Sequence, residues 1–197
     1  MAQNETQALF RELRTQAVIL GSFVGLMWIV FFVNWLFLGG RLYAWGIQPH
    51  SVVGLPGVLC APFLHGSLLH LLSNTLPFLT LGWLVMWRET RDFWPVTLIT
   101  WVVSGLGTWL IGAPTSVHIG ASGLVFGYLG YLIMRGYFDR SIPAIAFSVM
   151  VILLYGGMLW GILPISYGVS WQGHLFGLLG GGIAAYFLSP RSSRRRS

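Results

Sequence analysis

The chain is a series of long apolar segments separated by short connections that are polar or contain arginine. The first apolar segment runs from Ala17 to Leu38 without a charged residue. As an α-helix it would be ~33 Å long, which is enough to cross a bilayer and too long for a cleaved signal peptide. Five further apolar segments follow, at about 67–87, 93–112, 120–134, 142–163 and 171–189. The pattern predicts six transmembrane helices, with both termini on the same side of the membrane.

The connection between the first two predicted helices, from Gly39 to about Gly66, is long and apolar and contains Pro49, Pro56 and Pro62. Its Tyr43 and Trp45 are of the residue types that lie at the level of the lipid headgroups. Because a water-exposed loop would carry more charge, we expect this connection to lie in the outer membrane interface. The alternative is an ordinary extracytoplasmic loop.

Composition narrows the class of protein further. Hydrophobic residues make up 55% of the chain and charged residues only 8%, with a mean hydropathy of +0.74. Soluble domains carry ~25% charged residues, so the sequence indicates an all-α polytopic membrane protein. The single cysteine, Cys60, excludes an internal disulfide framework and a multi-cysteine metal site, and we expect no metal and no cofactor.

The net charge of +6 comes from arginine, since the chain has no lysine. Under the six-helix pattern only Arg41 falls on one side of the membrane. The other arginines share the opposite side: Arg11, Arg14, Arg88, Arg91, Arg135, Arg140, Arg191, Arg194, Arg195 and Arg196. An excess of arginine marks the cytoplasmic side, so both termini are predicted to be cytoplasmic, in the plasma (inner) membrane. Orientation explains the charge better than a nucleic-acid partner does.

The chain is expected to have three parts. Residues 1–15 are polar and form a cytoplasmic N-terminal segment, and residues 16–189 form one six-helix domain. Residues 190–197 form a basic cytoplasmic tail that is disordered and faces lipid. The sequence contains no internal repeat, and it leaves the oligomeric state open.

The carboxylates all map to predicted cytoplasmic ends or loops, at Glu5, Glu12, Glu89, Asp92 and Asp139. A proton-coupled transporter or an intramembrane aspartyl protease needs carboxylates within the membrane, so this distribution argues against both. The H-E-x-x-H motif of zinc proteases is absent, because no Glu lies between His65 and His70.

Four polar residues within the predicted helices remain as candidates: His70, Asn74, Ser122 and His174. Counted at ~1.5 Å per residue from the cytoplasmic arginine of each helix, the last three lie ~20–26 Å into a core ~30 Å thick. The candidates therefore meet in the outer half of the membrane, and His70 and Asn74 share a helix face. For each histidine and for Asn74, hydrogen bonding between helices is the alternative role.

Ser122 lies where a loop of small residues meets an apolar helix, within residues 117–124. Gly120 and Gly123 would let the backbone approach a bound carbonyl, and a helix N-terminus offers unpaired N–H groups to a developing oxyanion. The helix after Ser122 is predicted to be short, so the preceding loop, residues 114–119, would dip into the membrane beside water. A packing surface of small residues is the alternative.

Three motifs, in this order along the chain, resemble the rhomboid family of intramembrane serine proteases. They are His65-Gly66-Ser67-Leu68-Leu69-His70 with Asn74, Gly120-Ala121-Ser122-Gly123, and Gly173-His174-Leu175-Phe176-Gly177 with Gly181. The resemblance covers nearly all of residues 16–189 and implies a six-transmembrane-helix rhomboid-like bundle. It also implies a nucleophile, Ser122, its base, His174, and oxyanion stabilisation by His70, Asn74, Gly120 and the backbone N–H of Ser122.

The resemblance therefore predicts a serine endopeptidase that hydrolyses peptide bonds in or next to transmembrane segments. A Ser-His dyad is expected rather than a triad, because no carboxylate is predicted within the membrane. The partners would be transmembrane protein substrates and the lipid bilayer. The alternatives are a catalytically silent rhomboid-like protein that binds membrane clients and, third, a small-molecule transporter or channel.

One departure from the family pattern concerns the first loop. Many rhomboids have a Trp-Arg pair there, but Trp45 precedes Gly46 and Arg41 precedes Leu42 in this chain. The anchoring of the first loop is therefore unassigned.

A second departure concerns the surroundings of His174. Phe126 occupies the position at which some members have a tyrosine that stacks on the catalytic histidine. Stacking is still expected, without a hydroxyl hydrogen bond, and packing on Phe126 is expected to orient His174. Gly177 and Gly181 form a G-x-x-x-G motif that is expected to bring the last helix close to the helix of Ser122.

Overall fold

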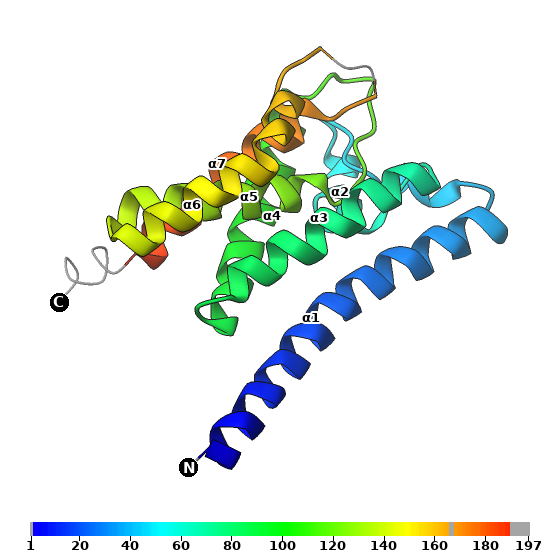
Figure 1. The fold of residues 1–197 in the computed structure, drawn as a ribbon. Coiled ribbons are helices and arrows are strands. Elements are labelled where there is room, and N and C mark those ends of the chain that lie inside the picture. Colours follow the sequence, from blue (N-terminus) through cyan, green and yellow to red (C-terminus); the bar gives the residue numbers. More distant parts are fainter. Residues whose placement is uncertain (1, 166–167, 190–197) are drawn as a thin grey trace.

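The computed structural model describes residues 2–165 and 168–189, which form a bundle of helices (Figure 1). The long helices are α1 (Ala2–Leu36), α3 (Leu68–Met86), α4 (Phe93–Ile111), α5 (Ser122–Asp139), α6 (Ile142–Tyr155) and α7 (Trp171–Leu188). The short ones are α2 (Gly57–Cys60) and the 3-10 helices η1 (Arg41–Trp45), η2 (Val52–Gly54), η3 (Ala61–Phe63), η4 (Thr90–Asp92) and η5 (Gly156–Ile162). Among the described residues, one isolated antiparallel bridge, between Ile47 and His118, is the only β-pairing. The predicted all-helical fold is confirmed.

Four helical stretches in the described part of the chain are long and apolar enough to cross a membrane: Glu5–Leu36, Leu68–Met86, Thr90–Ile111 and Ile142–Ile162. The protein is therefore a multi-pass membrane protein. Helices α5 and α7 have 18 residues each. Glycines and polar side chains lower their hydropathy, and several of these residues form the site described below.

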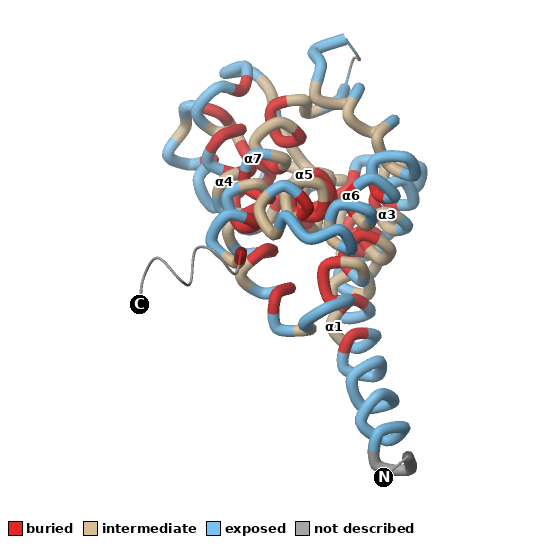
Figure 2. Tube along the Cα trace, turned by 60° about the vertical axis from the view of Figure 1, so that its left-hand side comes forward, coloured by how far each residue is buried: buried red, intermediate tan, exposed pale blue. Residues whose placement is uncertain are grey.

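Helix boundaries agree with the sequence pattern at α3, α4 and α7 and differ at the start of α1. The first helix begins at Ala2 rather than near Ala17, because the polar residues before Ala17 are mostly good helix formers. Figure 2 shows the described start of this helix as exposed, beyond the rest of the bundle. The predicted basic tail, residues 190–197, lies outside the described residues.

The prediction of a short fourth helix is wrong. Helix α5 has 18 residues and continues beyond Met134 to Asp139. Arg135 and Asp139 lie one helical turn apart and form an ion pair of 3.3 Å, so these charged residues extend the helix instead of ending it. The helix ends before Arg140, whose φ of 51° is left-handed.

The charged residues of α5 belong to a cluster at the end of the helix away from Ser122. Arg135 donates to Asp92 at 3.0 Å and pairs with Asp139, which also accepts a hydrogen bond of 2.7 Å from Arg88. The Tyr131 hydroxyl donates to Asp92 at 3.1 Å. Because buried charges are costly unless they are paired, this cluster joins α5 to η4 and to the end of α3.

Helix α5 is central, since it packs against α3, α4, α6 and α7. Its closest approach is to α7, where a Cβ on Gly177 or Gly181 would overlap the carbonyl oxygen of Gly123 or Gly127, respectively. The predicted close packing of these two helices is therefore present. Figure 2 shows buried residues where α4, α5 and α7 meet.

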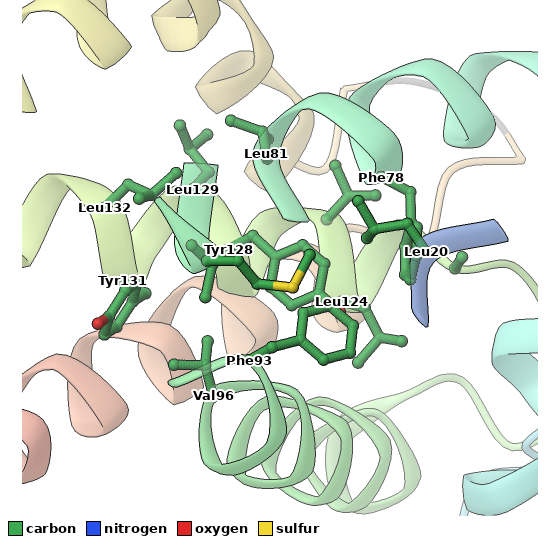
Figure 3. Packing of buried hydrophobic residues seen from close by; sticks show 14 of the residues in the cluster. Leu20, Phe78, Leu81, Phe93, Val96, Leu124, Tyr128, Leu129, Tyr131 and Leu132 are labelled. Carbon is green, nitrogen blue, oxygen red and sulfur yellow. The ribbon is translucent and has the colours of Figure 1, made fainter. Parts of the chain in front are cut away.

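Aromatic side chains form the centre of the hydrophobic core (Figure 3). The Tyr128 ring packs against Phe78 of α3 and Phe93 of α4, with centroids 5.5 Å and 5.8 Å apart. Its hydroxyl is hydrogen-bonded to Thr97 at 2.9 Å, which satisfies a buried polar atom. These contacts join α3, α4 and α5 into one unit.

Two tryptophans of α4 hold the connection between α1 and α3. Trp101 Nε1 donates to the Val58 carbonyl at 2.7 Å, and Trp109 Nε1 donates to the Ser51 carbonyl at 2.8 Å. The bridge from Ile47 then pairs this connection with the loop that leads into α5. The first loop is thus anchored without a Trp-Arg pair.

Candidate active site

The four polar residues selected from the sequence line one cavity. Its volume is about 820 Å³, and its walls come from α3, α5, α7 and the loops around them. His70 and Asn74 line it from α3, Ser122 from α5 and His174 from α7. No Asp, Glu or Arg is among the described residues that line this cavity. These four residues therefore come together around one cavity, as their positions along the helices predicted.

Ser122 is the first residue of α5, and Gly120 makes the turn before it possible. Gly120 has a φ of 117°, which side-chain-bearing residues rarely adopt, and a Cβ there would lie 2.6 Å from His70 Nε2. The Gly120 N–H is already used, because it donates to the Ala61 carbonyl at 2.8 Å. Gly120 therefore supplies space and not an oxyanion donor, which corrects part of its expected role. The N–H groups of the first turn of α5 are the backbone donors that a bound anion could use.

His174 is held by a ring and by a backbone carbonyl. The Phe126 ring stacks on it with a centroid distance of 4.1 Å and an interplanar angle of 7°. Nδ1 lies 2.8 Å from the Gly161 carbonyl in η5, and since a carbonyl only accepts, Nδ1 carries the proton. Nε2 is then the unprotonated nitrogen, able to accept a proton. The expectation that packing alone orients His174 is therefore incomplete.

The Ser122 hydroxyl makes no hydrogen bond to His174 within residues 2–165 and 168–189. Both side chains nevertheless line the same cavity, from adjacent helices. Nucleophile–base hydrogen bonds are often long in ligand-free proteins and shorten when substrate is bound. The arrangement therefore brings a serine hydroxyl and an imidazole with a free acceptor nitrogen to the same cavity.

His70 and Asn74 lie one above the other on α3, as their spacing predicted. The Asn74 Nδ2 donates to the His70 carbonyl at 3.0 Å, so one of its two amide hydrogens remains for another acceptor. Ser67 caps the start of α3 by accepting from the His70 N–H at 3.1 Å. This cap fixes the first turn of the helix and with it the position of the His70 ring beside Gly120.

A second, smaller cavity of about 30 Å³ also reaches Ser122. Ser104 and Thr108 of α4 line it, and the Ser104 hydroxyl donates to the Gly173 carbonyl at 2.9 Å. A space of this size, with these two hydroxyls among mostly apolar walls, is large enough for one water molecule. Water can therefore be held next to Ser122 on the side of α4.

His65 lies beside the site, and no role for it was predicted from the sequence. Its Nε2 accepts from the Ala121 N–H at 3.5 Å, and its ring lies 5.0 Å from that of His70, centroid to centroid. Burial, followed by the neighbouring His70, lowers the pKa of His65 to about 4, against the opposing effect of the Phe63 backbone. His65 is thus neutral near pH 7 and can act as an acceptor. The one sequence feature that could have pointed to His65 is its position as the first residue of the motif that contains His70 and Asn74.

The described residues hold no group of three His, Cys, Asp or Glu side chains arranged for a metal ion. The polar atoms of the site are instead a serine hydroxyl at a helix start, an imidazole with a free acceptor nitrogen, and side-chain donors on the opposite wall. Fold and site together define an all-helical membrane protein with an uncharged polar cavity between its helices.

Comparison with known proteins gives the family. The family model described as Rhomboid domain matches residues 54–191, so the chain belongs to the rhomboid family. An uncharacterized protein of Mycobacterium tuberculosis is 43% identical over 185 residues, which cover 89% of this chain and 76% of that protein. The Rhomboid-like protease 5 of Toxoplasma gondii is 33% identical over 63% of this chain and 15% of its own length. The RHOMBOID-like protein 4 of Arabidopsis thaliana is 28% identical over 68% of this chain and 34% of its own length.

Proposed function

We propose that the protein is an intramembrane serine protease that cleaves peptide bonds in or next to the transmembrane segments of other membrane proteins. The observation that carries the proposal is that Ser122 and His174 line one cavity, with His174 Nδ1 bound to the Gly161 carbonyl. This bond leaves Nε2 free to take the serine proton. A backbone carbonyl thus orients the base, a task that an aspartate performs in a catalytic triad.

In the proposed mechanism, the Ser122 Oγ attacks the scissile carbonyl while His174 Nε2 accepts its proton. The protonated His174 then gives this proton to the leaving amine, and an acyl-enzyme remains. A water molecule attacks the ester carbonyl with His174 again as base, which releases the new carboxyl end and restores Ser122. The small cavity beside Ser104 has room for one such water molecule next to Ser122.

The oxyanion of the tetrahedral intermediate would be stabilised by His70, Asn74 and the Ser122 backbone N–H. Asn74 is 4% exposed and His70 faces Gly120, so both groups are partly shielded from bulk water. Hydrogen bonds to a developing charge are strongest in such surroundings, and one donor is typically worth ~2.7–4 kcal/mol.

The proposed topology has six membrane spans, with α5 and α7 completing the four that are apolar by composition. Both termini are placed in the cytoplasm of the plasma (inner) membrane, on the side of the arginine cluster around Arg88 and Arg135. Ser122 lies at the opposite end of α5, and this position supports a site in the outer half of the bilayer.

Asn74→Ala is expected to lower kcat by up to ~10²–10³-fold while leaving the fold intact, because one oxyanion donor is lost and the others remain. The measurement is cleavage of a single-span substrate by the purified protein in detergent, together with its thermal unfolding. Asn34→Ala is the matched control, since Asn34 is also buried and accepts from the Leu42 N–H at 3.0 Å. It should lower thermal stability but not kcat. If Asn74→Ala behaves like Asn34→Ala, then Asn74 only holds the helices together.

Substrates are expected to be cut near their outer end, at a site where the helix unwinds easily. A serine nucleophile needs an extended carbonyl, whereas a helical carbonyl is shielded by its own hydrogen bond. Gly and Pro destabilise a helix interior by about 1 and about 3 kcal/mol relative to Ala, so replacing them by Leu near the cut should slow cleavage. The narrow approach at Gly120 further favours Ala or Ser immediately before the scissile bond.

This expectation is checked with a panel of single-span substrates that carry Ala, Leu or Trp before the cut, with products identified by mass spectrometry. Equal cleavage of the three, or cuts near the cytoplasmic end, would contradict the placement of Ser122. Binding of the panel without any cleavage would favour the alternative, a silent rhomboid-like protein that binds membrane clients.

A further inference from the structure

His118 lies where three segments of the chain meet, close to Ser122. Its backbone N–H and carbonyl both pair with Ile47 at 2.9 Å, in the connection between α1 and α3. Its Nε2 lies 2.7 Å from the Ser116 hydroxyl, in its own loop. Its Nδ1 lies 2.7 Å from the hydroxyl of Ser170, the residue before the first turn of α7. His118 is thus bonded through its backbone and through both ring nitrogens.

The hydrogen bonds around His118 determine which ring nitrogen carries the proton. The Ser116 hydroxyl donates to the Ala113 carbonyl at 2.6 Å, so it can only accept from His118 Nε2. Nδ1 is then unprotonated and accepts from the Ser170 hydroxyl. Burial lowers the pKa of His118 and thereby favours this neutral form. The ring is therefore held in one tautomer and one orientation.

The His118 ring links the two chain segments that carry Ser122 and His174. On one side of His118, the chain continues through Gly120, bound to the Ala61 carbonyl, into Ser122. On the other side, Ser170 accepts at its carbonyl from the His174 N–H at 3.1 Å, at the start of α7. The glycine contacts between α5 and α7 hold these helices close along their length. The bond between His118 and Ser170 holds together the ends that carry Ser122 and His174.

We infer that His118 is a positioning residue that sets the distance between Ser122 and His174 by tying the loop before α5 to the start of α7. The inference rests on the proposed protease function. His118 does not take part in proton transfer, since Ser116 and Ser170 occupy both of its ring nitrogens. A misplacement of ~1 Å between reacting groups can cost ~10²-fold in rate, so a bond at this position has a large effect on kcat.

His118→Ala is expected to lower kcat by ~10–100-fold. KM should change less than about threefold, because His118 is only one of the residues that line the cavity and the others remain. Ser170→Ala should produce a loss of similar size, and the double variant should be no slower than the slower single variant. His118→Gln should recover part of kcat, because its amide offers a donor and an acceptor at one side-chain end. The number of active sites is counted by labelling Ser122 with a fluorophosphonate, so kcat is reported per reactive serine.

His50→Asn is the matched control. His50 is another loop histidine. Its Nε2 lies 3.1 Å from the Gly112 carbonyl, and its ring is tilted by 41° against that of Trp109 in α4. Asn tolerates the positive φ of His50, and kcat should stay within about twofold of the wild-type value. Thermal unfolding of every variant separates a loss of stability from a loss of positioning.

The possible results distinguish the inference from the function on which it rests. A wild-type protein that neither cleaves the substrate panel nor labels with the fluorophosphonate would overturn both. A wild-type protein that cleaves, with a His118→Ala variant whose kcat per labelled serine stays within about twofold, would overturn the inference alone. The inference would also be overturned if the fold-loss in kcat of the double variant equalled the product of the two single fold-losses. His118 and Ser170 would then act separately.

Discussion

Replacing Ser122 by Ala, or His174 by Ala, is expected to abolish cleavage of single-span substrates, and the double variant is expected to be no worse than either single one. The two groups perform one proton transfer, so losing either removes the same step, and such pairs are strongly non-additive. His174→Ala also removes the ring that stacks on Phe126 and bonds to the Gly161 carbonyl, so some loss of stability should accompany it. Ser122→Ala removes only a hydroxyl and should unfold at the wild-type temperature.

The measurement is product formation over hours with purified protein in detergent, beside labelling by a fluorophosphonate. Ser189→Ala is the control, because Ser189 is a buried serine at the far end of α7 whose hydroxyl donates to the Tyr186 carbonyl at 3.0 Å. It should cleave and label like the wild type. Cleavage by the Ser122→Ala protein at more than trace rates would rule out the dyad.

The second large effect is expected from Gly181→Ala on the packing of α7 against α5. A Cβ at this position would overlap the Gly127 carbonyl oxygen and lie 2.6 Å from the Tyr131 N, both of them backbone atoms. Backbone cannot move aside as a flexible side chain can, so the two helices must separate. Overpacking of a dense core costs about 1–3 kcal/mol and occasionally more. Because the shift acts along the whole contact, it should also separate His174 from Ser122 and reduce cleavage.

The neighbouring Gly182→Ala provides the control within the same helix. A Cβ there would meet only the Met134 Cγ, at 3.6 Å, an ordinary contact with a flexible side chain. Ala is a better helix former than Gly by about 0.5–1 kcal/mol, so this variant should be as stable as the wild type or slightly more stable. Thermal unfolding in detergent and cleavage of one substrate are measured for both variants. Equal behaviour of Gly181→Ala and Gly182→Ala would show that the close contact does not determine the packing.

The positions of the helices and of the four candidate residues followed from the sequence because both depend on local pattern. Apolar segments of membrane length, interrupted by arginines, predict where α3, α4 and α7 begin and end. Helical rise converts position along the chain into depth, which is why His70, Asn74, Ser122 and His174 could be expected at one level. The pattern failed at the start of α1 and at the C-terminal end of α5. There, polar and charged residues continue a helix that hydropathy alone would end.

From the sequence alone, an all-helical membrane protein could be predicted, with a serine and a histidine on different helices at a similar depth. How these groups are held depends instead on contacts between distant segments. The Gly161 carbonyl that sets the His174 tautomer, the Ala61 carbonyl that occupies the Gly120 N–H, and the Ser170 hydroxyl that binds His118 come from segments distant from their partners. Hydrogen bonds of this kind depend on where the chain brings its loops together, and no periodicity or spacing in the sequence encodes that arrangement.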